Sequence, residues 1–129
     1  IDSSALLSIL FDEPERQHFN ELIATAPIRL MSTATYLETA IVLIARYGLP
    51  GLSNLKLYCV TASIEIVSFN SEQATIAVNA YAKYGKGKHP AALNFGDCIS
   101  YSLAKIRVEP LLFKGDDFTK TDIASFTHG

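Results

Sequence analysis

Segments with helical periodicity alternate with short apolar segments along the whole chain, and this alternation constrains the fold more than any other feature. The apolar segments at 28–31, 64–67 and 110–113 have the length and composition of buried strands. Between them, apolar side chains recur at the three- and four-residue spacing of helices. Helices that connect successive strands allow these strands to pair in parallel. The sequence therefore predicts an α/β fold with a mainly parallel central sheet flanked by helices.

Capping residues and helix breakers place the predicted helices. Pro14 suits the first position of one helix, and Ser32 or Thr33 can cap another that ends near Gly48. Ser71 can cap a further helix. The predicted helices begin near residues 5, 14, 33, 52, 71 and 94, and a short one follows residue 115.

Length and composition favour a single domain, residues 1–129, in the cytoplasm. A chain of 129 residues can bury a substantial core as one unit. No apolar run approaches the ~18 residues that span a bilayer, so no membrane association is expected. The chain does not open with a basic region followed by an apolar stretch, as a signal peptide would. Cys59 and Cys98 lack the paired spacing of a zinc site or a disulfide framework.

Several carboxylates stand where a functional site is expected. Asp2 and the pair Asp116 and Asp117 follow predicted strands, and ligands of open α/β sheets bind beyond the carboxyl ends of the strands. Glu38 falls on the apolar face of a helix, where an unpaired charge is costly. Asp97 begins another helix. Each also has a purely structural explanation: a partly exposed helix edge for Glu38, and a cap or a turn for the others.

Convergence of these carboxylates would require a cation. Two like charges ~4 Å apart repel by about 4 kcal/mol at an effective dielectric constant near 20, so several would not stay ionised together without neutralisation. Oxygen ligands favour hard ions. A converged cluster therefore predicts a site for Mg²⁺ or Mn²⁺.

A basic, glycine-rich loop indicates nucleic-acid binding. Its basic and aromatic residues are Lys83, Lys86, Lys88, His89, Tyr81 and Tyr84. Lysines bind phosphates, and bases stack on aromatic rings. A solvated loop is the structural alternative. The loop lacks the GK[ST] ending of a phosphate-binding P-loop.

Four ordered motifs resemble those of the PIN-domain ribonucleases, specifically the VapC toxins of bacterial toxin–antitoxin pairs, over nearly the whole chain. They are Ile1-Asp2-Ser3-Ser4-Ala5-Leu6-Leu7 with Glu13-Pro14-Glu15, Leu37-Glu38, Tyr84-Gly85-Lys86-Gly87 through Leu93-Asn94-Phe95-Gly96-Asp97-Cys98, and Leu112-Phe113-Lys114-Gly115-Asp116-Asp117-Phe118 with Thr121-Asp122-Ile123. The resemblance implies a PIN-like three-layer sandwich whose first strand is truncated before Ile1. It also implies metal-dependent endonucleolytic cleavage of RNA.

The resemblance further assigns roles and partners. The family's acidic positions fall on Asp2, Glu38, Asp97 and Asp117. Asp116 is an alternative to Asp117, and Asp122 is a secondary candidate that supports the metal through water or holds the site together. The expected partners are an RNA substrate, a second copy of the chain and a small VapB-like antitoxin whose C-terminal segment lies across the active site.

The working hypothesis is that Asp2, Asp97 and Asp117, helped by Glu38, hold one or two Mg²⁺ ions that activate water for attack on a phosphodiester. The residues expected to bind the RNA backbone are Lys86, Lys88 and His89. The residues expected to orient the ligands of the metal are Ser3, Ser4 and Asn94.

Three alternatives remain at this point. A receiver domain for phosphotransfer would carry an acidic pair after the first strand, and a dehalogenase-type phosphatase would carry a DxD motif there. Neither pattern fits Asp2, which is followed by two serines. A PIN domain that binds its antitoxin but no longer cuts RNA is the third alternative, although all four expected carboxylates are present.

Overall fold

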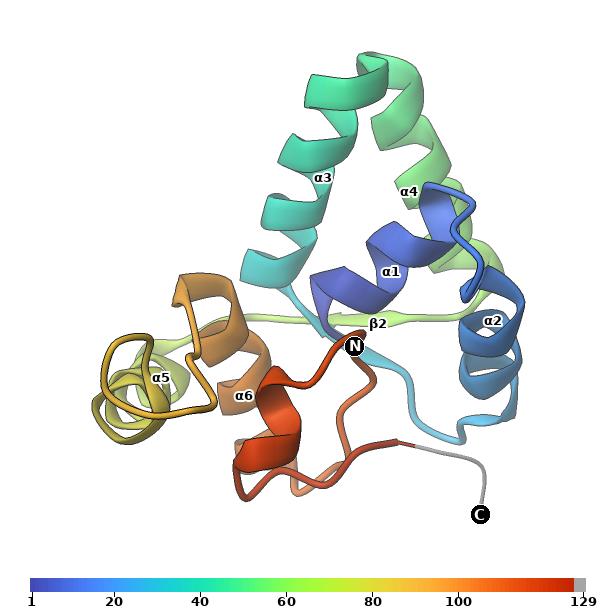
Figure 1. Cartoon of the computed structure of the whole chain (residues 1–129). Helices are drawn as coiled ribbons and strands as arrows, with labels where there is room; N and C mark the ends of the chain where they lie inside the picture. The colour runs from blue at the N-terminus through green and yellow to red at the C-terminus, as the bar shows by residue number, and fades with distance from the viewer. Residues whose placement is uncertain (127–129) are drawn as a thin grey trace.

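A computed structural model describes residues 1–126 and is rich in helices (Figure 1). The elements, in chain order, are α1 (Ser3–Leu10), α2 (Arg16–Thr25), β1 (Leu30–Ser32), α3 (Thr33–Tyr47), α4 (Leu49–Thr61), β2 (Glu65–Val67), α5 (Ser71–Tyr84), α6 (Phe95–Arg107) and the 3-10 helix η1 (Asp117–Lys120). Within residues 1–126, no helix is both long enough and apolar enough to cross a membrane.

The sheet is parallel, as predicted, but shorter than expected. β1 pairs with β2 in a register that sets Leu30 opposite Glu65. The backbone nitrogen of Ile1 donates to the carbonyl of Leu30 (2.8 Å), and that of Asp2 donates to the carbonyl of Leu112 (2.9 Å). Ile1 and Asp2 thus run between β1 and the segment around Leu112. This extended stretch delivers the Asp2 side chain to the start of α1.

The prediction of a strand at 110–113 is wrong. Leu111 makes only an isolated parallel bridge to Ser125. Pro110 has no N–H to contribute to a ladder. Leu111 and Leu112 are buried, so their apolar character reflects packing into the core rather than membership of the sheet.

The starts of α2 and α5 differ from prediction. α2 begins at Arg16, and Pro14 lies in the turn before it. The side chain of Asn70, not that of Ser71, caps α5 by accepting a hydrogen bond from the Gln73 backbone (2.9 Å). The predicted Ser32 cap of α3 is confirmed by its bond from the Ala34 backbone (3.2 Å).

Buried apolar side chains of the described residues form two clusters. One joins α1, α2, α3, α4 and β1, and includes Leu6, Met31 and Leu43. The other joins α5 and α6 to the segment after them, and includes Leu93 and Phe118. Asp2 lies between the two clusters, where the start of α1 approaches α6 and η1 (Figure 1).

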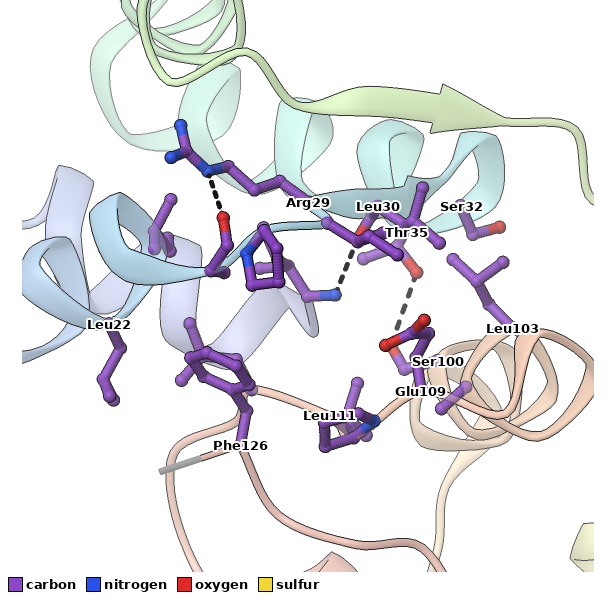
Figure 2. Close-up of a pocket in the computed structure, with 18 residues that line it drawn as sticks. Leu22, Arg29, Leu30, Ser32, Thr35, Ser100, Leu103, Glu109, Leu111 and Phe126 are labelled. Carbon is purple, nitrogen blue, oxygen red and sulfur yellow. Dashed lines mark hydrogen bonds between the residues drawn. The ribbon is translucent and has the colours of Figure 1, made fainter. Parts of the chain in front are cut away.

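An apolar cavity of about 230 Å³ opens between β1, α6 and the segment 109–112 (Figure 2). Its walls include Leu22, Leu103, Leu111 and Phe126. None of the four acidic residues of interest lines it. The cavity is therefore separate from the acidic cluster, although Ser100 borders both.

Candidate active site

Asp2 is the buried anchor of the site. Its side chain is 3% exposed, and it caps α1, because Oδ2 accepts from the Ser4 backbone (3.1 Å). Oδ1 accepts from the Ser100 hydroxyl of α6 (2.5 Å). The Ser100 oxygen also lies 3.4 Å from the Thr35 hydroxyl of α3. One buried carboxylate thus links the first residues of the chain to two distant helices.

Asp97 stands in the first turn of α6 and forms a capping box with Asn94. The Asn94 side chain accepts from the Asp97 backbone (2.9 Å), and the Asp97 carboxylate accepts from the Asn94 backbone (3.0 Å). The structural explanation of Asp97 as a capping residue is therefore correct. It also fixes where the carboxylate points, since the reciprocal bonds restrain its position.

The electrostatics of Asp97 show that the four carboxylates are neighbours. Burial raises the pKa of Asp97 to about 6, against a lowering by the hydrogen bond from Asn94. The charges of Asp2, Asp117 and Glu38 raise this pKa further. These three groups come from three segments far from Asp97 and from one another in the sequence, and all act on its carboxyl group.

Glu38 reaches the start of α6 by packing against Gly96. A Cβ atom built on Gly96 would lie 2.8 Å from Oε1 of Glu38 and nearer still to Oε2. The carboxylate therefore occupies the space that any other side chain at this position would need. Glu38 is half-buried, which agrees with the partly exposed helix edge that was its structural explanation, and its carboxylate lies against the start of α6.

Asp117, rather than Asp116, faces the cluster. Asp117 opens η1 and acts on Asp97, whereas the charge of Asp116 is not among those that do. The Ser4 hydroxyl accepts a hydrogen bond from the Lys114 backbone (2.9 Å), which ties this segment to the start of α1. Phe118 is buried and anchors η1 in the core.

Several predicted site residues have other tasks. Asp122 accepts hydrogen bonds from the Tyr101 hydroxyl and the Lys105 ammonium group, both 2.6 Å. His89 accepts from the Ala91 backbone (3.0 Å), and its ring packs edge-on against Tyr84 (5.0 Å between centroids). Ser3 makes no side-chain hydrogen bond among those described for residues 1–126. Asp122 and His89 thus have structural contacts of their own.

The donor set suits a hard divalent cation, because four carboxylates supply oxygen atoms alone. Within residues 1–126, no three acidic, cysteine or histidine side chains are gathered closely enough to hold an ion together. The structure thus brings the carboxylates into one neighbourhood without forming a complete coordination sphere.

Two contributors to the site escaped prediction. Ser100 lies three residues after Asp97, on the same side of α6, and that spacing is a signal that could have found it. Gly96 belongs to the motif Leu93-Asn94-Phe95-Gly96-Asp97-Cys98. Its contact with Glu38, however, depends on how α3 crosses α6, and no local sequence pattern predicts that crossing.

Comparison with known proteins assigns the family. A model of the PIN domain matches residues 1–124. The chain is 53% identical to ribonuclease VapC30 of Mycobacterium tuberculosis, over 97% of this chain and 95% of that protein. It is 51% identical to ribonuclease VapC of Mycolicibacterium smegmatis, over 97% of each. VapC20 of Mycobacterium tuberculosis, a toxin that cleaves the sarcin–ricin loop, shares the fold, with a TM-score of 0.78 at 13% identity over 95% of this chain and 94% of that one.

The chain belongs to the PIN-domain family. Within this family it groups with the VapC ribonucleases, the toxin endoribonucleases that hydrolyse RNA. The predicted resemblance and the α/β, PIN-like fold are confirmed, and the receiver-domain and phosphatase alternatives are wrong. Ribonucleases of this group generally depend on a divalent metal ion.

Replacement of Asp122 with Asn is expected to leave RNA cleavage unchanged and to lower stability by less than about 1 kcal/mol, because the carboxylate is partly exposed and screened. Partial burial alone would raise the pKa of Asp122, but the bonds from Lys105 and Tyr101 lower it below its usual value. The stability that its charge contributes is present above the unfolded pKa and is lost as pH falls through the folded pKa. Thermal unfolding of both proteins near neutral pH and at about pH 3 should therefore show a difference that narrows in acid. Loss of cleavage by folded variant would instead place Asp122 in the metal site.

Proposed function

We propose that the protein cuts RNA by hydrolysis that depends on Mg²⁺ or Mn²⁺, with Asp2, Glu38, Asp97 and Asp117 as the acidic residues of the active site. The observation that carries this proposal is the convergence of carboxylates from distant segments at the start of α6, where Glu38 packs against Gly96 and Asp97 is held by Asn94. The pKa of Asp97 is raised mainly by burial, and the charges of three other carboxylates add to this rise. An ionised Asp97 in such surroundings is costly, and binding of a cation would offset that cost.

The chain's own residues would divide the work. A divalent cation supplies the means to lower the pKa of bound water and to neutralise charge on a phosphodiester. Asp2, Asp97 and Asp117 would hold it, and Glu38 would complete the acidic wall from α3. Ser100 and Ser4 fix the two oxygens of Asp2, and Asn94 fixes Asp97. These bonds keep the carboxylates oriented toward one place.

Cleavage of total cellular RNA by antitoxin-free protein tests the proposal directly. Reactions with Mg²⁺, with Mn²⁺ and with EDTA are compared on a sequencing gel. Discrete fragments that appear with a metal and vanish with EDTA support the proposal. The rates of cleavage with Mg²⁺ and with Mn²⁺ show which ion is preferred. Fragments that persist in EDTA would contradict metal dependence, and folded protein that cuts nothing would favour the non-catalytic, antitoxin-binding alternative.

Replacement of both Lys86 and Lys88 with Ala is expected to weaken RNA binding and reduce its dependence on salt. Both side chains are exposed, and neither forms an ion pair in the part of the chain that the structure describes. Each phosphate contact with a single strand contributes about −0.7 to the slope of log K against log salt concentration. The double variant should therefore have a slope smaller in magnitude by up to about 1.4. An unchanged slope in a filter-binding titration would exclude these lysines from the RNA site.

The partners that we propose are a VapB-like antitoxin and a second copy of the chain, both in the cytoplasm. Apolar side chains on α3 and α4 support this proposal: Leu37, Ile41, Leu57 and Val60 are all more than half exposed. Exposed apolar patches of this kind are typical of surfaces that bind other proteins. The surface around Phe11 is less available, because the Arg46 guanidinium lies 4.2 Å above the Phe11 ring.

A further inference from the structure

Phe95 is a large aromatic side chain with no evident structural task. It is the first residue of α6 and is 82% exposed. The helix start is already capped by Asn94 and Asp97, so the helix does not need a phenyl ring there. Burial of such a side chain would stabilise the fold, and Phe95 gains almost none of this stabilisation.

Phe95 is the chain neighbour of a residue that contacts the acidic cluster. Gly96, the next residue, is in contact with the Glu38 carboxylate. Asp97 follows one residue later in the same helical turn. A substrate held at the carboxylates would therefore pass within reach of Phe95.

The basic loop is attached to the same helix start. The Lys86 backbone donates to the carbonyl of Leu93 (2.9 Å), two residues before Phe95. This bond joins the backbone of the basic loop, at the exposed residue Lys86, to the segment that leads into Phe95. A positive charge and an exposed aromatic ring side by side are the two elements of a site for single-stranded nucleic acid.

The tyrosines that the sequence offered for base stacking serve less well. Tyr84 is 6% exposed and packs against His89 and Tyr101, so no base can reach its face. Tyr81 is 42% exposed, but its ring lies against Gly85. Phe95 is the more open aromatic surface near the carboxylates.

We infer that Phe95 stacks on a base of single-stranded RNA next to the phosphodiester to be cut and so positions the substrate, an inference that rests on the proposed function. Stacking on a phenyl ring does not select among bases. Phe95 would therefore favour unpaired RNA over duplex RNA, whose bases are already stacked. The exposed lysines of the basic loop, Lys86 and Lys88, favour the polyanion RNA over an apolar protein surface as the occupant.

The test is binding of a fluorescent, single-stranded RNA oligonucleotide by anisotropy, in EDTA and in the Asp97→Asn background, so that binding is measured without cleavage. Phe95→Ala is expected to weaken binding about 5- to 150-fold, the range for loss of one stacked base. Phe95→Trp should retain or improve binding, and Phe95→Leu, which keeps apolar volume without an aromatic face, should behave like Ala. The salt dependence should not change, in contrast to variants of Lys86 and Lys88.

Val108→Ala is the matched control, since Val108 is 88% exposed at the opposite end of α6, and its binding should equal that of the parent. Equal binding by Phe95→Ala and the parent would overturn the inference, as would equal binding by Leu and Phe at position 95. A variant that binds RNA normally but changes the mass of the particle in sedimentation would assign Phe95 to a protein interface instead. Because no metal or cleavage enters this assay, failure of the metal-dependent mechanism would not affect it.

Discussion

Replacement of Asp97 with Asn is expected to lower the rate of RNA cleavage by about 100- to 1000-fold, the usual cost of removing one preorganised electrostatic group from an active site. Asn is a close match in shape, and its side-chain oxygen can still accept the hydrogen bond that Asp97 takes from the Asn94 backbone. The capping box should therefore survive while the charge is lost. Single-turnover cleavage of a defined RNA, beside circular dichroism of the same sample, measures both.

The same variant should be more stable than the parent when no metal is present. Burial raises the pKa of Asp97 to about 6, with Asp2, Asp117 and Glu38 raising it further, so its ionised form destabilises the fold. For a carboxyl group with a raised folded pKa, stability falls as pH rises from the unfolded value to the folded one and stays low above it. At neutral pH, the Asn variant should gain about 1–2 kcal/mol after allowance for screening.

Added Mg²⁺ should reverse this order. A cation that binds the folded protein stabilises it according to its affinity, and the parent, with its full set of carboxylates, should gain more than Asp97→Asn. Asp122→Asn serves as the control, because it removes a carboxylate that is already bound by Lys105 and Tyr101. If Asp97→Asn cuts at the parental rate while EDTA still abolishes cleavage, the metal is held elsewhere.

The acidic cluster could be predicted in outline from local patterns together with the family resemblance. Predicted strand ends, a helix start and an apolar helix face indicated Asp2, Asp97, Glu38 and the pair Asp116 and Asp117, and the resemblance favoured Asp117 over Asp116. Long-range partners could not be predicted in this way. Ser100 binds a carboxylate 98 positions away, and no local pattern records that distance.

Strand prediction is limited in the same way, because local patterns do not show which segments pair in a sheet. In the apolar run 110–113, Leu111 and Leu112 are buried, whereas Pro110 is exposed. Whether a buried run joins a sheet depends on neighbouring backbone, and here Pro110 and the isolated bridge to Ser125 leave it outside one. Similarly, the sequence indicated Asp122 as a candidate site residue. Its hydrogen bonds with Tyr101 and Lys105 could not be predicted, because they depend on how the chain returns to α6.

Gly96 provides the sharpest test of how Glu38 is positioned. In Gly96→Ala, the new methyl group would lie 2.8 Å from Oε1 of Glu38 and nearer to Oε2, so the carboxylate must move. It sits at the end of a flexible side chain, and Ala favours helices by up to about 1 kcal/mol over Gly, so stability should hardly change. A displacement of about 1 Å in an active site can reduce the rate about 100-fold, and we expect a loss of that size.

Gly51→Ala is the matched control, because its methyl group would meet the backbone oxygen of Leu43 at 2.6 Å, and backbone cannot move aside as a side chain can. It should lower the free energy of unfolding by about 1–3 kcal/mol and leave the rate per folded molecule unchanged. The decisive comparison is a double-mutant cycle with Glu38→Gln. If Gly96→Ala acts by displacing Glu38, the double variant should cut little more slowly than either single variant. Additive losses would mean that Gly96 influences cleavage without Glu38, through the backbone at the start of α6.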